Sequence, residues 1–150
     1  MEEAPAEEPV LAPDFTVWNY DGEAVRLSDY LGTPVVLNFW ASWCGPCLSE
    51  LGAFEQAYSD YGDSVQFMMV NITDGARDTE ELVRSFVSDY GYSFPVFFDS
   101  ELDATNTYGV YSIPMTFFIA ADGTIIHSNL GAMTMDSLTA GIESIQLSDK

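Results

Sequence analysis

The sequence is poor in basic residues. Only 4 lysines and arginines stand against 24 aspartates and glutamates among 150 residues, which gives a net charge of −20. A field of this sign repels the phosphates of nucleic acids and the headgroups of anionic lipids. We therefore exclude nucleic-acid binding and binding to an anionic membrane surface as functions.

Cysteine and histidine are equally scarce. The chain holds two cysteines, Cys44 and Cys47, and one histidine, His127. These are too few for a zinc site of four cysteines or of two cysteines and two histidines. A disulfide across so short a loop adds little stability, because the chain-entropy effect grows with loop length. The pair therefore fits a redox couple better than a structural staple or a zinc site, and we expect no metal and no cofactor.

Long hydrophobic runs are absent as well. No apolar stretch approaches the ~18 residues of a membrane span, and the start, MEEAPAEEPVLAPDF, lacks the basic and apolar regions of a signal peptide. Its alternating acids and prolines predict a stiff, solvated leader over residues 1–11 that is disordered. We interpret this leader as the remainder of a tether whose signal or anchor is not in the sequence. Residues 12–150 suffice for one domain with a proper core.

Segments of strand and helix character alternate along that domain. An Asp21-Gly22 turn predicts an N-terminal β-hairpin, and the continuous apolar run PVVLNFWA predicts a buried strand. Further strands are expected in SVQFMMVNI, in FPVFFD and in the hairpin MTFFIAADGTIIHSNLG, and helices over 46–61, 78–91, 101–108 and 135–147. The alternation predicts an α/β fold with a mixed central β-sheet and helices on both faces.

The CxxC motif follows the buried strand directly and opens the next helix. Cys44 then lies at the helix N-terminus, where unpaired backbone N–H groups stabilise a thiolate. Pro46 suits the first turn because its missing N–H costs nothing there. Cys47 lies one turn further along. This arrangement predicts that Cys44 is the attacking thiolate and Cys47 the resolving thiol.

The stretch FWASWCGPC resembles the thioredoxin superfamily. The segment APDFTVWNYDGEAVRLSDYLGTPVVLNFWA, together with CLSEL, resembles the TlpA/ResA-like branch of extracytoplasmic thiol-disulfide oxidoreductases. The resemblance runs from about Ala12 to Leu147 and implies a thioredoxin fold with a helix inserted between core strands. It also implies disulfide-containing protein substrates, a membrane-bound thiol protein as electron donor, and a membrane-tethered location in the periplasm or at the cell surface. The sequence leaves the oligomeric state open, with a monomer favoured.

The resemblance also indicates a substrate-binding surface. In YGVYSIPMTFF, Pro114 matches the family's cis-proline, and the backbone of Ile113 would pair with a bound substrate segment. Trp43, Gly45 and Pro46 complete the expected surface around the attacking sulfur. A cis bond before proline is a minority state that its surroundings must hold.

Glu50 is the expected acid/base. Typical thioredoxins carry a buried Asp in the strand before the motif, whereas this chain has Asn38, which cannot take a proton. Glu50 lies one helical turn after Cys47, as in ResA-type proteins, and could accept or relay its proton. The alternative is an exposed acid near a helix N-terminus, where acids are favoured.

Two other functions remain open. A thioredoxin-fold copper protein could use Cys44, Cys47 and His127, since two thiolates can hold Cu(I); an exposed strand histidine is the simpler interpretation of His127. A thiol peroxidase would share the fold, but the Pro-Thr-xx-Cys setting of its reactive cysteine is missing. We predict a reductase of protein disulfides. No lysine or arginine neighbours the motif, so we expect a weakly stabilised thiolate and a potential nearer roughly −270 mV than −120 mV.

Overall fold

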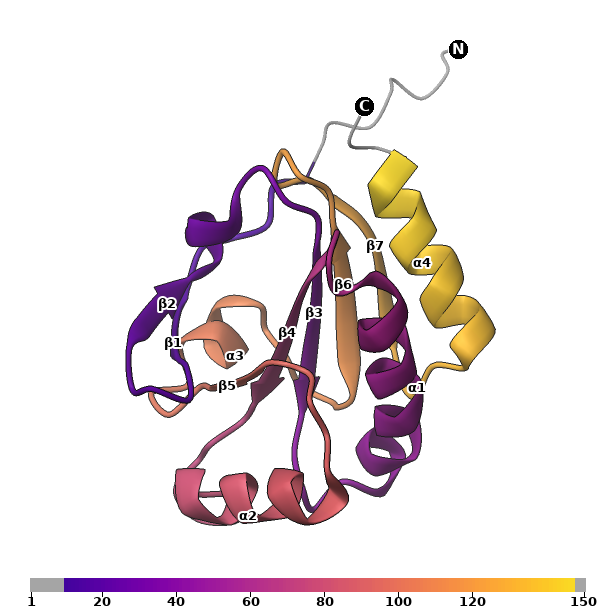
Figure 1. Cartoon of the computed structure of the whole chain (residues 1–150). Coiled ribbons are helices and arrows are strands. Elements are labelled where there is room, and N and C mark those ends of the chain that lie inside the picture. Colours follow the sequence, from indigo (N-terminus) through magenta and orange to yellow (C-terminus); the bar gives the residue numbers. More distant parts are fainter. Residues whose placement is uncertain (1–9, 148–150) are drawn as a thin grey trace.

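A computed structural model of the chain describes residues 10–147 (Figure 1). The strands are β1 (Thr16–Trp18), β2 (Ala24–Arg26), β3 (Val35–Trp40), β4 (Gln66–Asn71), β5 (Val96–Phe98), β6 (Met115–Ile119) and β7 (Ile125–Leu130). The helices are the 3₁₀-helix η1 (Leu27–Tyr30), α1 (Gly45–Tyr61), α2 (Glu80–Tyr90), α3 (Asp103–Thr107) and α4 (Met135–Leu147). Within residues 10–147, no helix is long and apolar enough to cross a bilayer.

All the strands belong to one mixed sheet with the order β2-β1-β5-β4-β3-β6-β7. The central strands β3, β4 and β5 are parallel, and the β1–β2 and β6–β7 hairpins flank them in antiparallel pairing. Helix α2 lies between β4 and β5 in the chain, as expected for the inserted helix. The predicted α/β fold with an N-terminal hairpin is confirmed.

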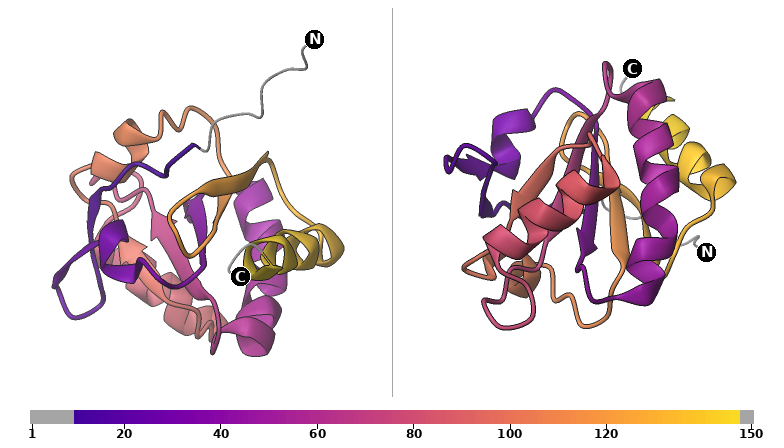
Figure 2. Two further views of the ribbon diagram at one scale, coloured as in Figure 1. Left: turned by 90° about the horizontal axis from the view of Figure 1, so that it is seen from above. Right: turned by 60° about the horizontal axis from the view of Figure 1, so that its bottom comes forward.

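Strand β3 supplies both hydrophobic cores, because alternate side chains of a strand point to opposite faces. Val36 and Trp40 pack in the core under α1, α2 and α4. Leu37 and Phe39 pack in the core on the other face, which α3 and η1 help to cover. Figure 2 shows α1 and α4 on one side of the sheet and α3 on the other. The alternation puts the buried amide of Asn38 on the α1 side.

Helix α2 shows how local signals fix the ends of an element. Both Asp78 and Thr79 could have capped its N-terminus, and Thr79 does: its hydroxyl accepts a hydrogen bond from the N–H of Leu82 at 3.2 Å. Gly91 ends the helix with a φ of 73°, a left-handed conformation in which glycine carries no Cβ penalty. The carboxylate of Asp78 therefore does not cap α2 and is available for hydrogen bonds with other parts of the chain.

Val10 and Leu11, assigned above to the disordered leader, lie along the start of β7. The N–H of Ile125 donates to the carbonyl of Val10 and the N–H of Ala12 to the carbonyl of Gly123, both at 2.8 Å. Leu11 forms a β-bridge to the same hairpin. The edge of the sheet offers unpaired backbone groups that a short apolar segment can satisfy. Residues 1–9 of the expected leader lie outside the described residues.

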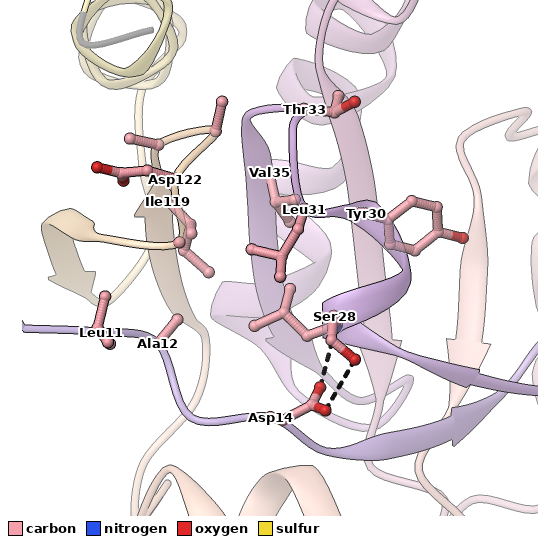
Figure 3. A pocket seen from close by; sticks show the side chains of 14 residues that line it. Leu11, Ala12, Asp14, Ser28, Tyr30, Leu31, Thr33, Val35, Ile119 and Asp122 are labelled. Carbon is pink, nitrogen blue, oxygen red and sulfur yellow. Dashed lines mark hydrogen bonds between the residues drawn. The ribbon is translucent and has the colours of Figure 1, made fainter.

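An apolar cavity of about 230 Å³ lies beside this N-terminal segment (Figure 3). Leu27, Leu31, Val35 and Ile119 line it, and at its rim the N–H and hydroxyl of Ser28 bond to the carboxylate of Asp14. Val35 begins β3, whereas the CxxC motif follows the end of the same strand. The cavity is therefore at the end of the sheet away from the cysteines and is not part of their site.

Helix α4 packs against α1 and against β6. A Cβ atom at Gly141 would lie 2.5 Å from the ring of Phe118, which is far shorter than a van der Waals contact. A larger residue at position 141 would therefore require the Phe118 ring or the helix to shift. The turn before α4 carries Met133, whose N–H donates to Glu50 on α1.

Candidate active site

The two cysteines lie at the junction between the end of β3 and the start of α1. Cys44 is the N-cap of α1, and the N–H of Cys47 donates to its Sγ at 3.2 Å. The two cysteines form a disulfide, and their Cα atoms are 5.2 Å apart. Cys44 keeps 6% of its surface exposed, whereas Cys47 is fully buried. The helix N-terminus thus favours a thiolate at the one sulfur that a substrate can reach.

The loop before β6 faces the attacking sulfur. The Ile113–Pro114 peptide bond is cis, and the carbonyl oxygen of Ile113 lies 3.7 Å from Cys44 Sγ. Pro114 is buried and Ile113 is half-buried. The backbone of Ile113 therefore forms part of this wall of the site.

The other expected substrate-binding residues are on the surface. Gly45 and Pro46, the first two residues of α1, are exposed. Trp43 is 41% exposed directly before Cys44, whereas Trp40 is buried in the core. An exposed aromatic ring next to a reactive sulfur can bind a substrate chain as well as pack.

Glu50 is buried, so the alternative of a solvated acid is wrong. Only 1% of its surface is exposed. Its Oε1 accepts from the N–H of Met133 at 3.0 Å, and its Oε2 accepts from Asn38 Nδ2 at 2.8 Å. Burial raises the pKa of Glu50 from 4.5 to about 7, and the two hydrogen bonds offset part of the rise. A carboxyl group with this pKa both gives and takes protons near neutral pH.

Asn38 links Glu50 to the sheet. Its Nδ2 also donates to Thr116 Oγ1, on the adjacent strand β6, at 3.0 Å. Its Oδ1 is buried without a hydrogen-bond partner among the described protein groups. If the amide rotates by half a turn, this oxygen faces Glu50 and can accept from the protonated carboxyl group. Asn38 can therefore serve both protonation states of Glu50.

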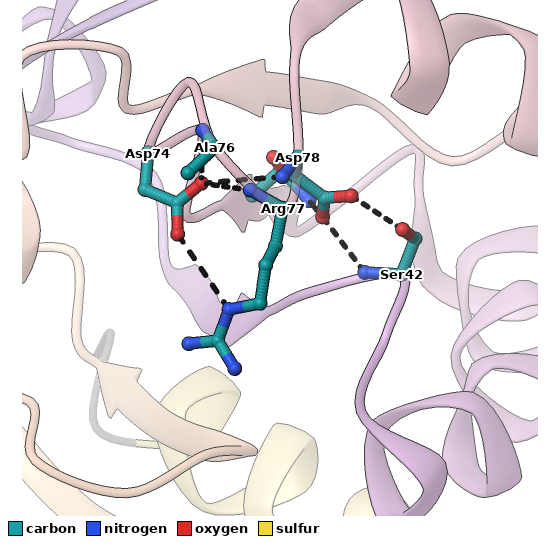
Figure 4. Close-up of polar contacts among 6 residues, drawn as sticks. Ser42, Asp74, Ala76, Arg77 and Asp78 are labelled. Carbon is teal, nitrogen blue, oxygen red and sulfur yellow. Dashed lines mark hydrogen bonds and ion pairs between the residues drawn. The ribbon is translucent and has the colours of Figure 1, made fainter.

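The sequence offered Asp78 only as a possible helix cap, whereas the structure places it beside the loop that leads into the motif. It is fully buried. Its carboxylate accepts from Asn71 Nδ2 at 2.9 Å, from the N–H of Ser42 at 2.8 Å and from the hydroxyl of Ser42 (Figure 4). Ser42 lies two residues before Cys44, so Asp78 fixes the loop that leads into the motif.

Sequence inspection did not identify Arg77 either. The expectation that no lysine or arginine lies near the motif is wrong for the folded chain, which brings Arg77 next to Trp43. Its guanidinium carbon lies 3.6 Å from the centroid of the Trp43 ring. Its Nε lies 4.0 Å from an oxygen of Asp74. A separation of more than 30 residues along the chain hides this contact from sequence inspection, since only the packing of the β4–α2 loop creates it.

The proposed third copper ligand is not part of this site. His127 is exposed on β7 and stacks on Phe118 with ring centroids 5.9 Å apart. Among residues 10–147, no group of three or more His, Cys, Asp or Glu side chains is arranged to hold a metal ion.

Comparisons with known proteins agree with this geometry. Residues 10–128 match the AhpC/TSA family. The chain is 37% identical to the thioredoxin-like protein YneN of Bacillus subtilis over 82% of its length and 71% of that protein. It is 33% identical to the thiol-disulfide oxidoreductase ResA of Bacillus thuringiensis over 89% of its length and 76% of ResA.

Among solved structures, the exposed lipoprotein thioredoxin Etrx1 of Streptococcus pneumoniae is 30% identical and superposes with a TM-score of 0.76. The match covers 88% of this chain and 99% of that structure. Fold, motif and sequence similarity agree over most of the chain. The chain belongs to the AhpC/TSA family and, within it, to the thioredoxin-fold thiol-disulfide oxidoreductases that include ResA.

Proposed function

We propose that the protein reduces disulfide bonds in other proteins with Cys44 and Cys47 as its dithiol. The observation that supports this most strongly is the pairing of an accessible sulfur at the start of α1 with a fully buried sulfur within bonding distance. The first can attack a substrate and the second can resolve the product. Membership of the ResA-like family supports the same chemistry.

The reaction runs in two exchanges. The Cys44 thiolate attacks one sulfur of the substrate disulfide, whose S–S bond breaks, and the sulfur that leaves takes up a proton. Cys47 then loses its proton and attacks Cys44 Sγ, which breaks the mixed disulfide and releases the second substrate thiol. Two electrons pass from the dithiol to the substrate, and the protein ends as the Cys44–Cys47 disulfide. An upstream dithiol protein restores it by the reverse steps.

Glu50 is the proposed acid/base of the second exchange. It is on the same helix as Cys47, one turn further along, and both side chains are buried. Bulk water is a poor proton acceptor for a buried thiol, so a carboxylate there speeds the loss of its proton. The pKa of about 7 lets Glu50 return that proton afterwards.

The direction of electron flow follows from thiolate stability. The helix N-terminus and the guanidinium of Arg77 on Trp43 favour the Cys44 thiolate. The ionised form of Glu50 and the net charge of −20 disfavour it. We expect the balance to leave a potential nearer roughly −270 mV than the −120 mV of a strong oxidant. Equilibration with glutathione measures it, and a value above roughly −180 mV would make the protein an oxidant instead.

We also propose a location outside the cytoplasm, where protein disulfides form and persist. The similarity to an exposed lipoprotein thioredoxin supports this. In that setting the protein would be tethered to the membrane and would work as a monomer. Its electron donor would be a membrane-bound thiol protein.

Substitution of each cysteine tests the mechanism. Cys44→Ser should abolish the reduction of insulin disulfides, whereas Cys47→Ser should accumulate a mixed disulfide with its substrate, detectable by mass spectrometry. Normal turnover by Cys47→Ser would show the two-cysteine mechanism to be wrong. Copper titration and peroxide consumption, measured on the same preparations, test the two alternative functions.

A further inference from the structure

We propose that Arg77 and Trp43 form a recognition platform for a carboxylate next to the substrate disulfide. The protein would then prefer disulfides that have an aspartate or glutamate beside the cysteine. This inference rests on the proposed function, since it assigns the substrate class of the same site.

The platform stands directly beside the reacting sulfur. Trp43 precedes Cys44 and is 41% exposed, and the Arg77 guanidinium lies over its ring at 3.6 Å. A guanidinium stacked on an aromatic face keeps its edge free, and that edge carries the N–H groups that fit a carboxylate. A peptide bound against the Ile113 carbonyl would bring the residues that flank its cysteine toward this edge.

The guanidinium of Arg77 has N–H groups that are available to bind a substrate carboxylate. Its side chain is 63% exposed. Within the described part of the chain, its one ion-pair contact is the 4.0 Å approach of Nε to Asp74. Figure 4 shows the two terminal nitrogens pointing away from Asp74. A substrate carboxylate can therefore bind these nitrogens without displacing an existing partner.

The loop that carries Arg77 is fixed at both ends. Asp74 Oδ1 accepts from the N–H groups of Ala76, Arg77 and Asp78 at 2.9, 2.9 and 3.2 Å. Asp78 is tied in turn to Ser42, next to Trp43. Because the folded chain already orders the loop, a substrate does not have to order it, and less affinity is lost on binding.

The distribution of charge on the protein strengthens the preference for a substrate with an acidic residue beside its disulfide. The other basic side chains that the structure describes are engaged elsewhere, since Arg26 pairs with Asp14 and Arg84 with Glu80. The net charge of −20 repels acidic proteins at long range. Arg77 therefore offers a local positive site on an otherwise repelling surface. The substrates that suit both features are neutral or basic proteins with a single acid beside the disulfide.

The test uses three peptide disulfides that differ only in the residue beside the cysteine, which is Glu, Gln or Lys. We expect the wild-type kcat/KM to be about fivefold higher for the Glu peptide than for the Gln peptide, as for a modest, partly exposed charge pair. Arg77→Gln should remove this preference, and Arg77→Glu should shift it to the Lys peptide. Asp74→Asn keeps an amide oxygen for the loop but removes the competing charge, so it should strengthen the preference for Glu.

A purely structural role of Arg77 would give a different result. If Arg77 only packs on Trp43, Arg77→Gln should lower kcat/KM equally for all three peptides or for none, and this would overturn the proposal. If no peptide is reduced at all, the proposed function fails by itself. The platform is then judged by fluorescence anisotropy of labelled peptides with serine in place of cysteine. Equal binding of the Glu peptide to wild type and Arg77→Gln would overturn it.

Discussion

Glu50 and Asp78 are both buried carboxylates close to the CxxC motif, but the protein holds them differently. Glu50, on α1, accepts one hydrogen bond from Asn38 and one from the backbone of Met133. Asp78, in the loop before α2, accepts two from Ser42 and one from Asn71. Donors favour the ionised form of a carboxyl group and burial opposes it. With only two donors, burial prevails at Glu50, whose pKa rises to about 7.

The comparison teaches that burial alone does not identify an acid/base. Glu50 is joined to an amide that can turn and to one backbone N–H, so it can change its protonation state without breaking the structure. Asp78 joins two loops through three donors. We therefore assign proton transfer to Glu50 and the positioning of the motif to Asp78. The four predictions that follow test this division.

Asp78→Ala should have the largest effect on stability. It leaves the half-buried N–H of Ser42 and the buried amide of Asn71 without their acceptor, and each such group costs about 1–3 kcal/mol. We expect the free energy of unfolding in urea to fall by about 4 kcal/mol. Asp78→Asn retains one acceptor oxygen and should lose about half as much. An Asp78→Ala protein as stable as wild type would show that the network does not anchor the motif.

Glu50→Gln should instead affect the rate. Gln is close in shape, and Asn38 can turn its oxygen toward the new amide group, so the fold is kept. We expect the resolving step to slow by about 10²-fold in single-turnover reduction of a model disulfide. The apparent pKa of the cysteine pair, from thiol alkylation against pH, should fall because a negative neighbour is gone.

Asp78→Asn is the matched control for that experiment. It also neutralises a buried carboxylate near the motif, but it should leave the resolving rate unchanged once the protein is folded. Equal rates and equal titrations in wild type and Glu50→Gln would remove the acid/base role from Glu50.

The pH dependence of stability should reveal the raised pKa of Glu50. Between pH 4.5 and about 7, folded Glu50 holds a proton that the unfolded chain releases. Stability therefore falls as the pH rises through this window. For the disulfide form we expect a loss on the order of 2 kcal/mol from pH 5 to 7 relative to Glu50→Gln. Backbone hydrogen bonds lower the pKa of Asp74, so it acts only at lower pH. A difference that is independent of pH would contradict the raised pKa.

Thr79→Ala should have the smallest effect. Thr79 caps α2 with a single exposed hydrogen bond to the N–H of Leu82. Its loss should cost about 1 kcal/mol in urea unfolding without altering the rate of either exchange. If Thr79→Ala were as damaging as Asp78→Ala, the distinction between a helix cap and an anchor of the motif would fail.

The sequence predicts most of the fold because its signals are local. The apolar run that becomes β3, the Asp21-Gly22 turn and the glycine at position 91 each act within a few residues. The dithiol is predictable for the same reason, since strand, motif and helix are contiguous. Glu50 is found by helical spacing from Cys47, but its burial depends on β3, β6 and the turn before α4.

What could not be predicted depends on contacts between distant segments. Arg77 meets Trp43, and Asp78 meets Ser42, only after β3 and β4 have paired in parallel. Nothing in the TDGARD loop distinguishes these residues from a solvated surface turn. The backbone contacts of Val10 and Ala12 have the same origin, because their partners belong to the last hairpin of the chain.

Gly141 has a consequence for how this site can evolve. Its missing side chain sets the height of α4 above Phe118, and Met133, in the turn that leads into α4, donates to Glu50. A larger residue at position 141 that displaced the helix would stretch that bond and so change the proton affinity of Glu50 from a distance. Selection can therefore retune the chemistry through a position that no substrate touches, while the cysteines, the cis-proline loop and the acid itself remain the same.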